Sequence, residues 1–297
     1  MSAAILLSFS ILFAVINNLL FHGFKNRGLR GMGDILLFNA LLSAVWILIL
    51  SVLNQGTRIS VQAWIWGIIY GSVTAAFLLC KMQALATGSV SITSFTGCSS
   101  LLISTAFGVI YFKETVSPIQ IAGVIILLFA LFLTLTNSKQ ESADDKKASK
   151  SWYIWCFLFF ICSGATGIIF KLHQSSSARD GVNQMMLAAS VTSTVLFLIS
   201  SLLVQWKTDK TLPCIKSPAW VYVITCGIVS CGYNRLNISL SGKLPSIVFF
   251  PIFNGSVILF ASLFAAIIFR EKITIRQTTG IAIGTFALIM AAGVFNM

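Results

Sequence analysis

Charged residues are scarce in this sequence. Lys, Arg, Asp and Glu make up 9% of its 297 residues, whereas a typical soluble domain has roughly 25%. Hydrophobic residues make up 57%, and the mean hydropathy is +0.92. A water-soluble domain exposes many charged side chains, and this chain has too few to cover such a surface. The composition therefore excludes a cytosolic enzyme and a disordered protein, and it predicts an integral membrane protein.

Acidic residues are the scarcest of the charged groups. There are 8 of them against 20 Lys and Arg, which gives a formal net charge of +12. The cations lie at the ends of apolar runs, where anionic lipid headgroups and membrane topology account for them, so nucleic acid is excluded as a partner. No acid lies at the centre of an apolar run, where a proton relay or a binder of cationic drugs usually needs a carboxylate.

Metal-ligating residues are also few and scattered. The two histidines, His22 and His173, are far apart in sequence, and none of the seven cysteines forms a CxxC pair. We expect the cysteines to be small packing residues. Membrane-embedded enzymes that act on lipids need clustered acids, histidines or a metal motif, and no D-x-x-D or HExxH motif is present. Neither a metal, a cofactor nor enzymatic activity is expected.

Long apolar runs are what the sequence has in abundance. Each is about 18–26 residues long, close to the ~20 residues that a helix needs to cross a bilayer. There are ten, at 3–22, 34–53, 62–86, 89–112, 119–136, 152–171, 183–205, 218–240, 246–269 and 274–295. The first run lacks a basic start and an A-x-A-like end, so we expect a membrane span rather than a signal peptide. The prediction is an all-α integral membrane protein with ten transmembrane helices.

A polar segment, residues 137–151, separates five runs from the other five. We interpret it as a linker between a first five-helix repeat, residues 1–136, and a second, residues 152–297. Residues 89–132 match residues 246–289 at an offset of 157. The matched pairs include Ser89 with Ser246, Phe112 with Phe269, Glu114 with Glu271, Gln120 with Gln277, and Gly123 with Gly280.

The number of helices in each repeat predicts how the repeats are oriented. Five is odd, so a second copy that begins where the first one ends crosses the bilayer in the opposite direction. Inverted repeats are the architecture of many secondary transporters, with a site near the midplane and alternating access by rocking of the halves. We therefore expect two inverted five-helix repeats and a transport function.

Two motifs carry a resemblance to a known family. They read F-K-E-T-x-S-P-x-Q-x-x-G over residues 112–123 and F-R-E-K-x-T-x-x-Q-x-x-G over residues 269–280. With these motifs and five helices in each half, the chain resembles the drug/metabolite transporter superfamily, in its EamA-like branch. The resemblance covers the whole chain. It implies a small-molecule permease, commonly an exporter of amino acids, metabolites or drugs.

The first helix departs from one branch of that superfamily. The small multidrug resistance relatives carry a carboxylate there, whereas the stretch from Phe13 to Phe21 offers only Asn17 and Asn18. This difference argues against proton antiport through an embedded Glu and against organic cations as substrates. It favours an amino-acid-like, neutral or anionic solute.

Lys81 and Arg235 are the cations farthest from the loops, at matched positions of the two repeats. One interpretation is that they face a central path and attract a carboxylate or another anionic group. The other is that their long side chains extend to the membrane interface or fix the topology. The sequence leaves both open.

Other intramembrane polar and small residues complete the candidate substrate site. The stripe that begins with Thr93 and Gly97 either lets helices pack closely or lines a hydrated path. Pro251 can kink its helix next to Asn254, and broken helices near the midplane are recurrent substrate sites. The candidate substrate-binding residues are Lys81, Gln83, Thr93, Gly97, Arg235, Asn237, Pro251, Asn254 and Asn17. We expect Glu114 and Glu271 to serve loop structure, beside helix caps at Ser117 and Thr274.

Membrane orientation is the point on which two arguments disagree. Apart from Lys81 and Arg235, thirteen Lys and Arg lie on the linker side and five on the side of the termini. The positive-inside rule then places the linker in the cytoplasm and both termini outside. The resemblance instead implies cytoplasmic termini. We favour the charge count, because it comes from this sequence itself, whereas the other orientation comes from the resemblance to other proteins.

The function that these patterns favour is secondary transport of a small organic metabolite across the cell membrane, in the direction of export. The protein would be multi-pass, with the solute and the lipid bilayer as partners, and a homodimer is left open. The alternatives are a membrane-embedded lipid-modifying enzyme and a non-transporting membrane subunit. The first lacks the clustered chemistry named above, and the second would need no internal repeat.

Overall fold

The computed structural model describes residues 2–28, 31–135, 150–208, 219–269 and 274–293, and these residues are helical with short connections and no strand. The helices are α1 (Ala3–Gly28), α2 (Met32–Leu53), α3 (Val61–Thr87), α4 (Val90–Ser99), α5 (Leu101–Tyr111), α6 (Pro118–Leu135), α8 (Lys150–Ser175), η1 (Arg179–Gly181), α9 (Val182–Thr208), α10 (Ala219–Ser241), α11 (Ser246–Phe269) and α12 (Ile275–Ala291). Each apolar run is therefore mainly helical over the residues that the structure describes. The run at 89–112 differs from expectation because it is divided at Ser100 into α4 and α5.

Eight segments in the described residues are long and apolar enough to cross a membrane. They are Ala3–Phe21, Met32–Leu53, Val61–Thr87, Ile92–Tyr111, Pro118–Leu135, Lys150–Ser175, Arg179–Val204 and Ser246–Ile268. The helix α12 is shorter, with 17 residues, and α10 is not among the eight. Large apolar side chains such as Leu48 (70% exposed), Ile110 (77%) and Trp206 (75%) lie on the outside of the bundle. Lipid is the solvent that suits such a surface, and the protein is a multi-pass membrane protein.

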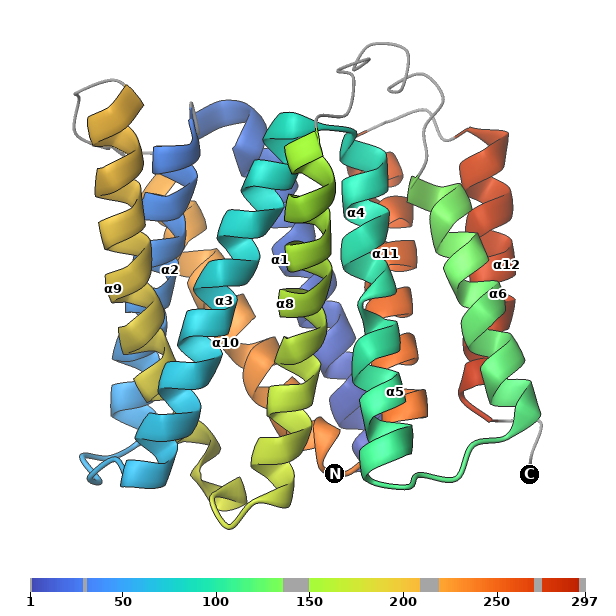
Figure 1. The fold of residues 1–297 in the computed structure, drawn as a ribbon, viewed down its shortest axis with the longest axis horizontal. Coiled ribbons are helices and arrows are strands. Elements are labelled where there is room, and N and C mark those ends of the chain that lie inside the picture. The colour runs from blue at the N-terminus through green and yellow to red at the C-terminus, as the bar shows by residue number, and fades with distance from the viewer. Residues whose placement is uncertain (1, 29–30, 136–149, 209–218, 270–273, 294–297) are drawn as a thin grey trace.

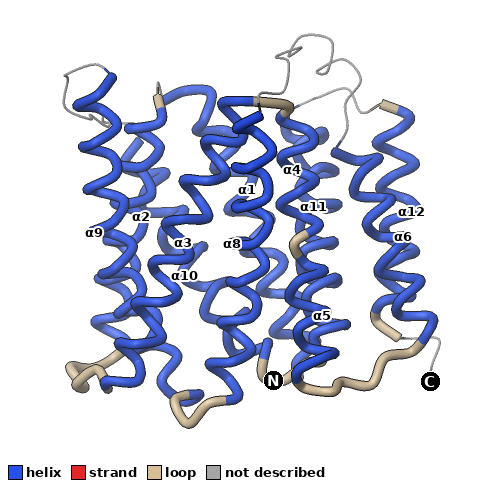
Figure 2. Tube along the Cα trace, viewed as in Figure 1, coloured by secondary structure: helices blue, strands red, loops and turns tan. Residues whose placement is uncertain are grey.

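The helices run side by side between two edges of the bundle, as Figures 1 and 2 show. In Figure 1, α1 begins at the lower edge and α8 begins at the upper edge, and α12 ends at the lower edge. At one end of the bundle α9 packs on α2 and α3, and at the other end α12 packs on α6. Between them, α1 contacts α10 and α11, while α8 contacts α3, α4 and α5. Helices of the N-terminal half therefore pack against helices of the C-terminal half throughout the bundle.

Close helix contacts in this bundle use small residues. A Cβ on Gly67 of α3 would lie 2.8 Å from the Ala189 nitrogen and the Met185 oxygen of α9. Only a glycine lets the two backbones approach so closely, as is usual in membrane interiors. Larger apolar side chains fill the remaining space, and Phe249, Leu127 and Leu131 are almost fully buried.

The predicted linker, residues 137–151, lies outside the described residues except for its last two positions. Glu271 of the second motif also lies outside them. The predicted helix cap at Thr274 is confirmed, since its side chain accepts a hydrogen bond from the Gln277 backbone and Gln277 bonds back to Thr274.

Candidate functional site

The helix α10 carries polar side chains that bond to three helices of the N-terminal half of the chain. Ser10 of α1 donates to Asn237 Oδ1 at 2.6 Å, and Trp46 Nε1 of α2 donates to Ser230 Oγ at 2.8 Å. The Tyr70 hydroxyl of α3 donates to Asn234 Oδ1 at 3.1 Å. Asn237 is 4% exposed and Ser10 is fully buried. The interior of the bundle therefore holds a line of amides and hydroxyls where the two halves of the chain meet.

The interruption between α4 and α5 is the second polar region, and Figure 2 shows it near the middle of the bundle. Ser100 Oγ lies 2.6 Å from Ser163 Oγ of α8 and donates to the Gly97 carbonyl at 2.6 Å. One turn later Ser104 donates to the Gly164 carbonyl at 2.9 Å. Side chains thus bond to a carbonyl at the end of α4, where the regular helical ladder stops.

Thr93 and Gly97, two of the predicted substrate-binding residues, also face α8. Trp152 Nε1 donates to Thr93 Oγ1 at 3.2 Å, and Cys156 Sγ lies 3.8 Å from the same oxygen. A Cβ on Gly97 would meet the Phe159 ring. Both residues therefore lie where α4 packs against the C-terminal half of the chain.

Lys81 and Arg235 are not brought together. Lys81 lies six residues before the end of α3 and Arg235 six residues before the end of α10, and these helices end at opposite edges in Figure 1. Lys81 is half-buried, with its Nζ 6.0 Å from the centre of the Phe77 ring. Arg235 is exposed and donates from Nε to Asn183 Oδ1 of α9 at 2.7 Å.

The other predicted site residues are spread over the bundle. The Gln83 amide lies 3.9 Å from the Met32 sulfur, and Asn17 of α1 has a buried Oδ1 without a hydrogen-bond partner. Pro251 is buried inside α11, which continues through it without a break. Asn254 donates to the Phe250 carbonyl of the same helix at 2.9 Å. Among the described helices, the interruption near the middle of the bundle lies between α4 and α5 rather than at Pro251.

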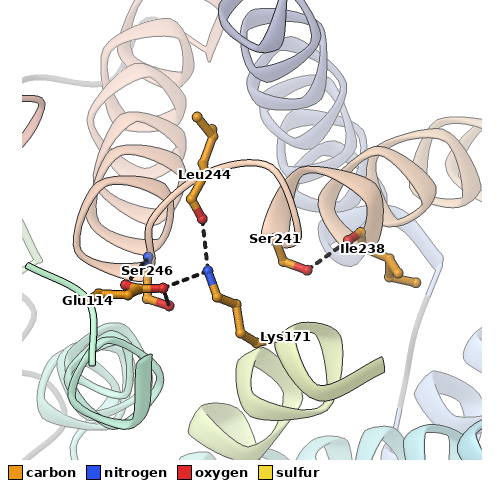
Figure 3. Close-up of polar contacts among 6 residues, drawn as sticks. All are labelled: Glu114, Lys171, Ile238, Ser241, Leu244 and Ser246. Atoms are coloured by element: carbon orange, nitrogen blue, oxygen red, sulfur yellow. Dashed lines mark hydrogen bonds and ion pairs between the residues drawn. The ribbon is translucent and has the colours of Figure 1, made fainter. Parts of the chain in front are cut away.

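A charged cluster that the sequence did not suggest lies at the lower edge in Figure 1 and is drawn in Figure 3. Lys171 Nζ of α8 lies 2.7 Å from Glu114 Oε1, and the two side chains are only 11% and 12% exposed. Glu114 also accepts from the Ser246 backbone at 2.6 Å and from the Ser246 hydroxyl at 3.1 Å. Lys171 donates to the Leu244 carbonyl at 2.9 Å.

This cluster changes the role expected for Glu114. The carboxylate does bond to a helix start, but the helix is α11 rather than α6, which directly follows Glu114 in sequence. In the sequence, Lys171 contributes only to the charge count that predicts the membrane orientation. Nothing in the local sequence pairs two residues 57 positions apart, so the contact emerges only from packing.

The buried polar groups set the chemistry that the interior can offer. Among the described residues no group of three or more His, Cys, Asp and Glu could hold a metal ion. The Oγ1 of Thr105, a residue 5% exposed, and Nε2 of the fully buried His173 have no hydrogen-bond partner. Amides, hydroxyls and carbonyls dominate, and such groups recognise a polar solute by hydrogen bonding.

Comparison with known proteins bears on the fold alone. Twenty-nine chains of solved structures match this one. One of them, described only as the crystal structure of a protein, has a TM-score of 0.73 and 13% identity over 99% of this chain and 97% of its own. No model of a known protein family matches the sequence, and no curated protein in the comparison matches it. The arrangement of helices described above therefore occurs over the full length of another protein of solved structure.

Proposed function

We propose that this protein is a secondary transporter that carries a small organic metabolite across the cell membrane by alternating access. All ten apolar runs cross the bilayer in this proposal, α10 and α12 included, as two inverted repeats of five helices. The transporter works in the direction of export and belongs to the EamA-like branch of the drug/metabolite transporters.

The observation that carries the proposal is that the two halves of the chain begin at opposite edges of the bundle. α1 begins at one edge and α8 at the other, as the odd number of helices in each sequence repeat requires. Helix contacts support the same arrangement, because α2 packs on α9 and α6 on α12, its counterparts in the repeat. A transporter whose halves rock on each other needs this kind of interface.

The chemistry of the interface supports a neutral or anionic solute. Hydroxyls and amides line the contacts between the halves, at Ser100, Ser163, Tyr70 and Asn234. Glu114 is engaged by Lys171 at the edge of the bundle. A solute with a carboxylate and polar groups, such as an amino acid, matches these hydrogen-bonding groups. In this proposal its carboxylate meets Lys81 toward one edge of the bundle and Arg235 toward the other.

Counterflow in proteoliposomes tests this function. Vesicles loaded with one unlabelled amino acid or organic acid at a time receive traces of the same labelled solute outside. We expect accumulation for at least one neutral or anionic solute and none in vesicles without protein. Absence of counterflow over the whole panel, from protein that is folded in the vesicles, would contradict the proposal.

The same assay tests the two cations. We expect Lys81→Gln and Arg235→Gln to raise the KM for an anionic solute about tenfold or more, which corresponds to ~1.4 kcal/mol of lost attraction. Arg58→Gln, at an exposed loop position, is the matched control and leaves the KM unchanged. Unchanged kinetics in both test variants would remove Lys81 and Arg235 from the substrate site.

A further inference from the structure

The Glu114–Lys171 ion pair joins the two halves of the chain, unlike the Arg179–Asp180 pair. Glu114 follows α5 in the N-terminal half, whereas Lys171, Leu244 and Ser246 belong to the C-terminal half. Arg179 and Asp180 are sequence neighbours in the short helix η1, and their side chains are 69% and 96% exposed. The buried pair therefore depends on how the halves sit against each other.

A buried ion pair is well suited to a contact that opens and closes. Removing both charges from water costs about as much as their attraction returns, so such a pair adds little net stability. If the halves separate at this edge, water reaches both charges and replaces the lost contacts. Each charge is therefore compensated by its partner in the closed state and by water in the open state. Neither is compensated if the halves shift without letting water in.

The backbone around the pair is built for close approach. A Cβ on Gly108 of α5 would overlap the Ser246 side chain at the start of α11. Lys113 has a φ of 52°, a left-handed conformation that is unfavourable for a residue other than glycine, and Glu114 follows it directly. A tight helix contact and a strained turn therefore coincide at the carboxylate.

Neutral groups make a contact between the two halves at the opposite edge of the bundle. There, near the start of α8, Trp152 bonds to Thr93 and its ring lies against Gly88. This contact between the halves is neutral, whereas the Glu114–Lys171 contact is ionic.

We propose that Glu114, Lys171 and Ser246 form a latch that closes the transport path at the edge of the bundle where α1 begins. This inference rests on the proposed function and adds to it a named contact for one of the two closed states. The latch holds α5, α8 and the start of α11 together, and its release exposes the interior side of α5 to water on that side of the membrane.

Cysteine accessibility tests the latch without requiring a substrate. Thr105 of α5 is 5% exposed and lies between the mid-bundle interruption and the latch. Thr105→Cys is the reporter, and a membrane-impermeant maleimide is applied to each face of the vesicles in turn. Arg58→Cys, in the exposed loop at the same edge, identifies that face. Protein without the reporter gives the background from native cysteines.

We expect Glu114→Gln and Lys171→Gln each to speed labelling of the reporter about tenfold, from the latch face only. The double variant labels no faster than the quicker single variant, because both substitutions break the same contact. Gly108→Ala, which separates α5 from Ser246 without altering charge, also speeds labelling. Gly31→Ala, where a Cβ has open space, does not.

Two results would overturn the latch. One is unchanged labelling in Glu114→Gln, Lys171→Gln and Gly108→Ala proteins that are folded at the labelling temperature, as their circular dichroism shows. The other is an equal rise at a control reporter, Ser43→Cys on α2, which is 6% exposed and distant in sequence, because general loosening would then explain the effect. Faster labelling without counterflow would defeat the transport proposal alone, and counterflow with unchanged labelling would defeat the latch alone.

Discussion

The segment α4–α5 and the helix α11 occupy matched places in the sequence repeat, but they are built differently. α11 runs without interruption from Ser246 to Phe269, even through Pro251. Its counterpart stops at Ser100, which has no proline near it. The difference teaches that a helix interruption inside a membrane depends on the groups available to bond the freed carbonyl, here the Ser100 and Ser163 hydroxyls, more than on the breaker residue itself.

The two segments also begin differently, and this gives the largest expected effect. α4 is capped by its own Ser89, whose side chain accepts from the Ile92 backbone, whereas α11 is capped by Glu114 from another element. Glu114→Ala leaves Lys171 buried without its carboxylate and should lower the free energy of unfolding by about 3–5 kcal/mol. Ser89→Ala should cost about 1 kcal/mol. Unfolding in mixed detergent micelles, followed by circular dichroism, measures both, and equal losses would contradict the contrast.

A second comparison uses Gly97 and Asn254, which are equivalent at the offset of 157 residues. Gly97→Leu forces a side chain into the Phe159 ring and should cost about 1–3 kcal/mol through overpacking. Asn254→Leu removes one hydrogen bond within α11 and should cost about 0.5–1 kcal/mol. The same unfolding assay ranks the two. A larger loss at Asn254 would mean that α11, not α4, has the tighter packing.

The smallest effect concerns the interruption itself. A double-mutant cycle of Ser100→Ala and Ser163→Ala should give a coupling energy of about 0.6 kcal/mol, the average for such bonds in membranes. Pro251→Ala should change stability by less than about 1 kcal/mol, because α11 is already continuous at that position. Zero coupling between the serines would show that the hydroxyl pair does not stabilise the interruption.

The sequence predicts the helices well because long apolar runs are strong signals. The run at 246–269 has the same bounds as α11, and most other ends differ by a few residues. The repeat also predicts that Lys81 and Arg235 have equivalent distances from the ends of their helices. Helix bounds and positions along a helix are predictable because they depend on local composition and on the spacing of apolar residues.

The candidate site is less predictable because it depends on partners distant in the sequence. The interruption at Ser100 involves Ser163, and Glu114 involves Lys171 and Ser246. Taken alone, the sequence around Ser100 predicts an ordinary apolar helix, and the sequence around Glu114 predicts a loop. Arg235 likewise bonds to Asn183, on a helix whose position no sequence pattern fixes. The predicted substrate role of Arg235 stays a prediction that the transport assays address.

The turn between α3 and α4 consists of Gly88 and Ser89 alone. Two residues span at most about 7 Å when fully extended, so such a turn has almost no slack. A displacement of α4 would therefore pull the end of α3 with it, and Lys81 is attached six residues from that end. The tether would convert a shift of the interrupted segment into a movement of a positive charge inside the membrane.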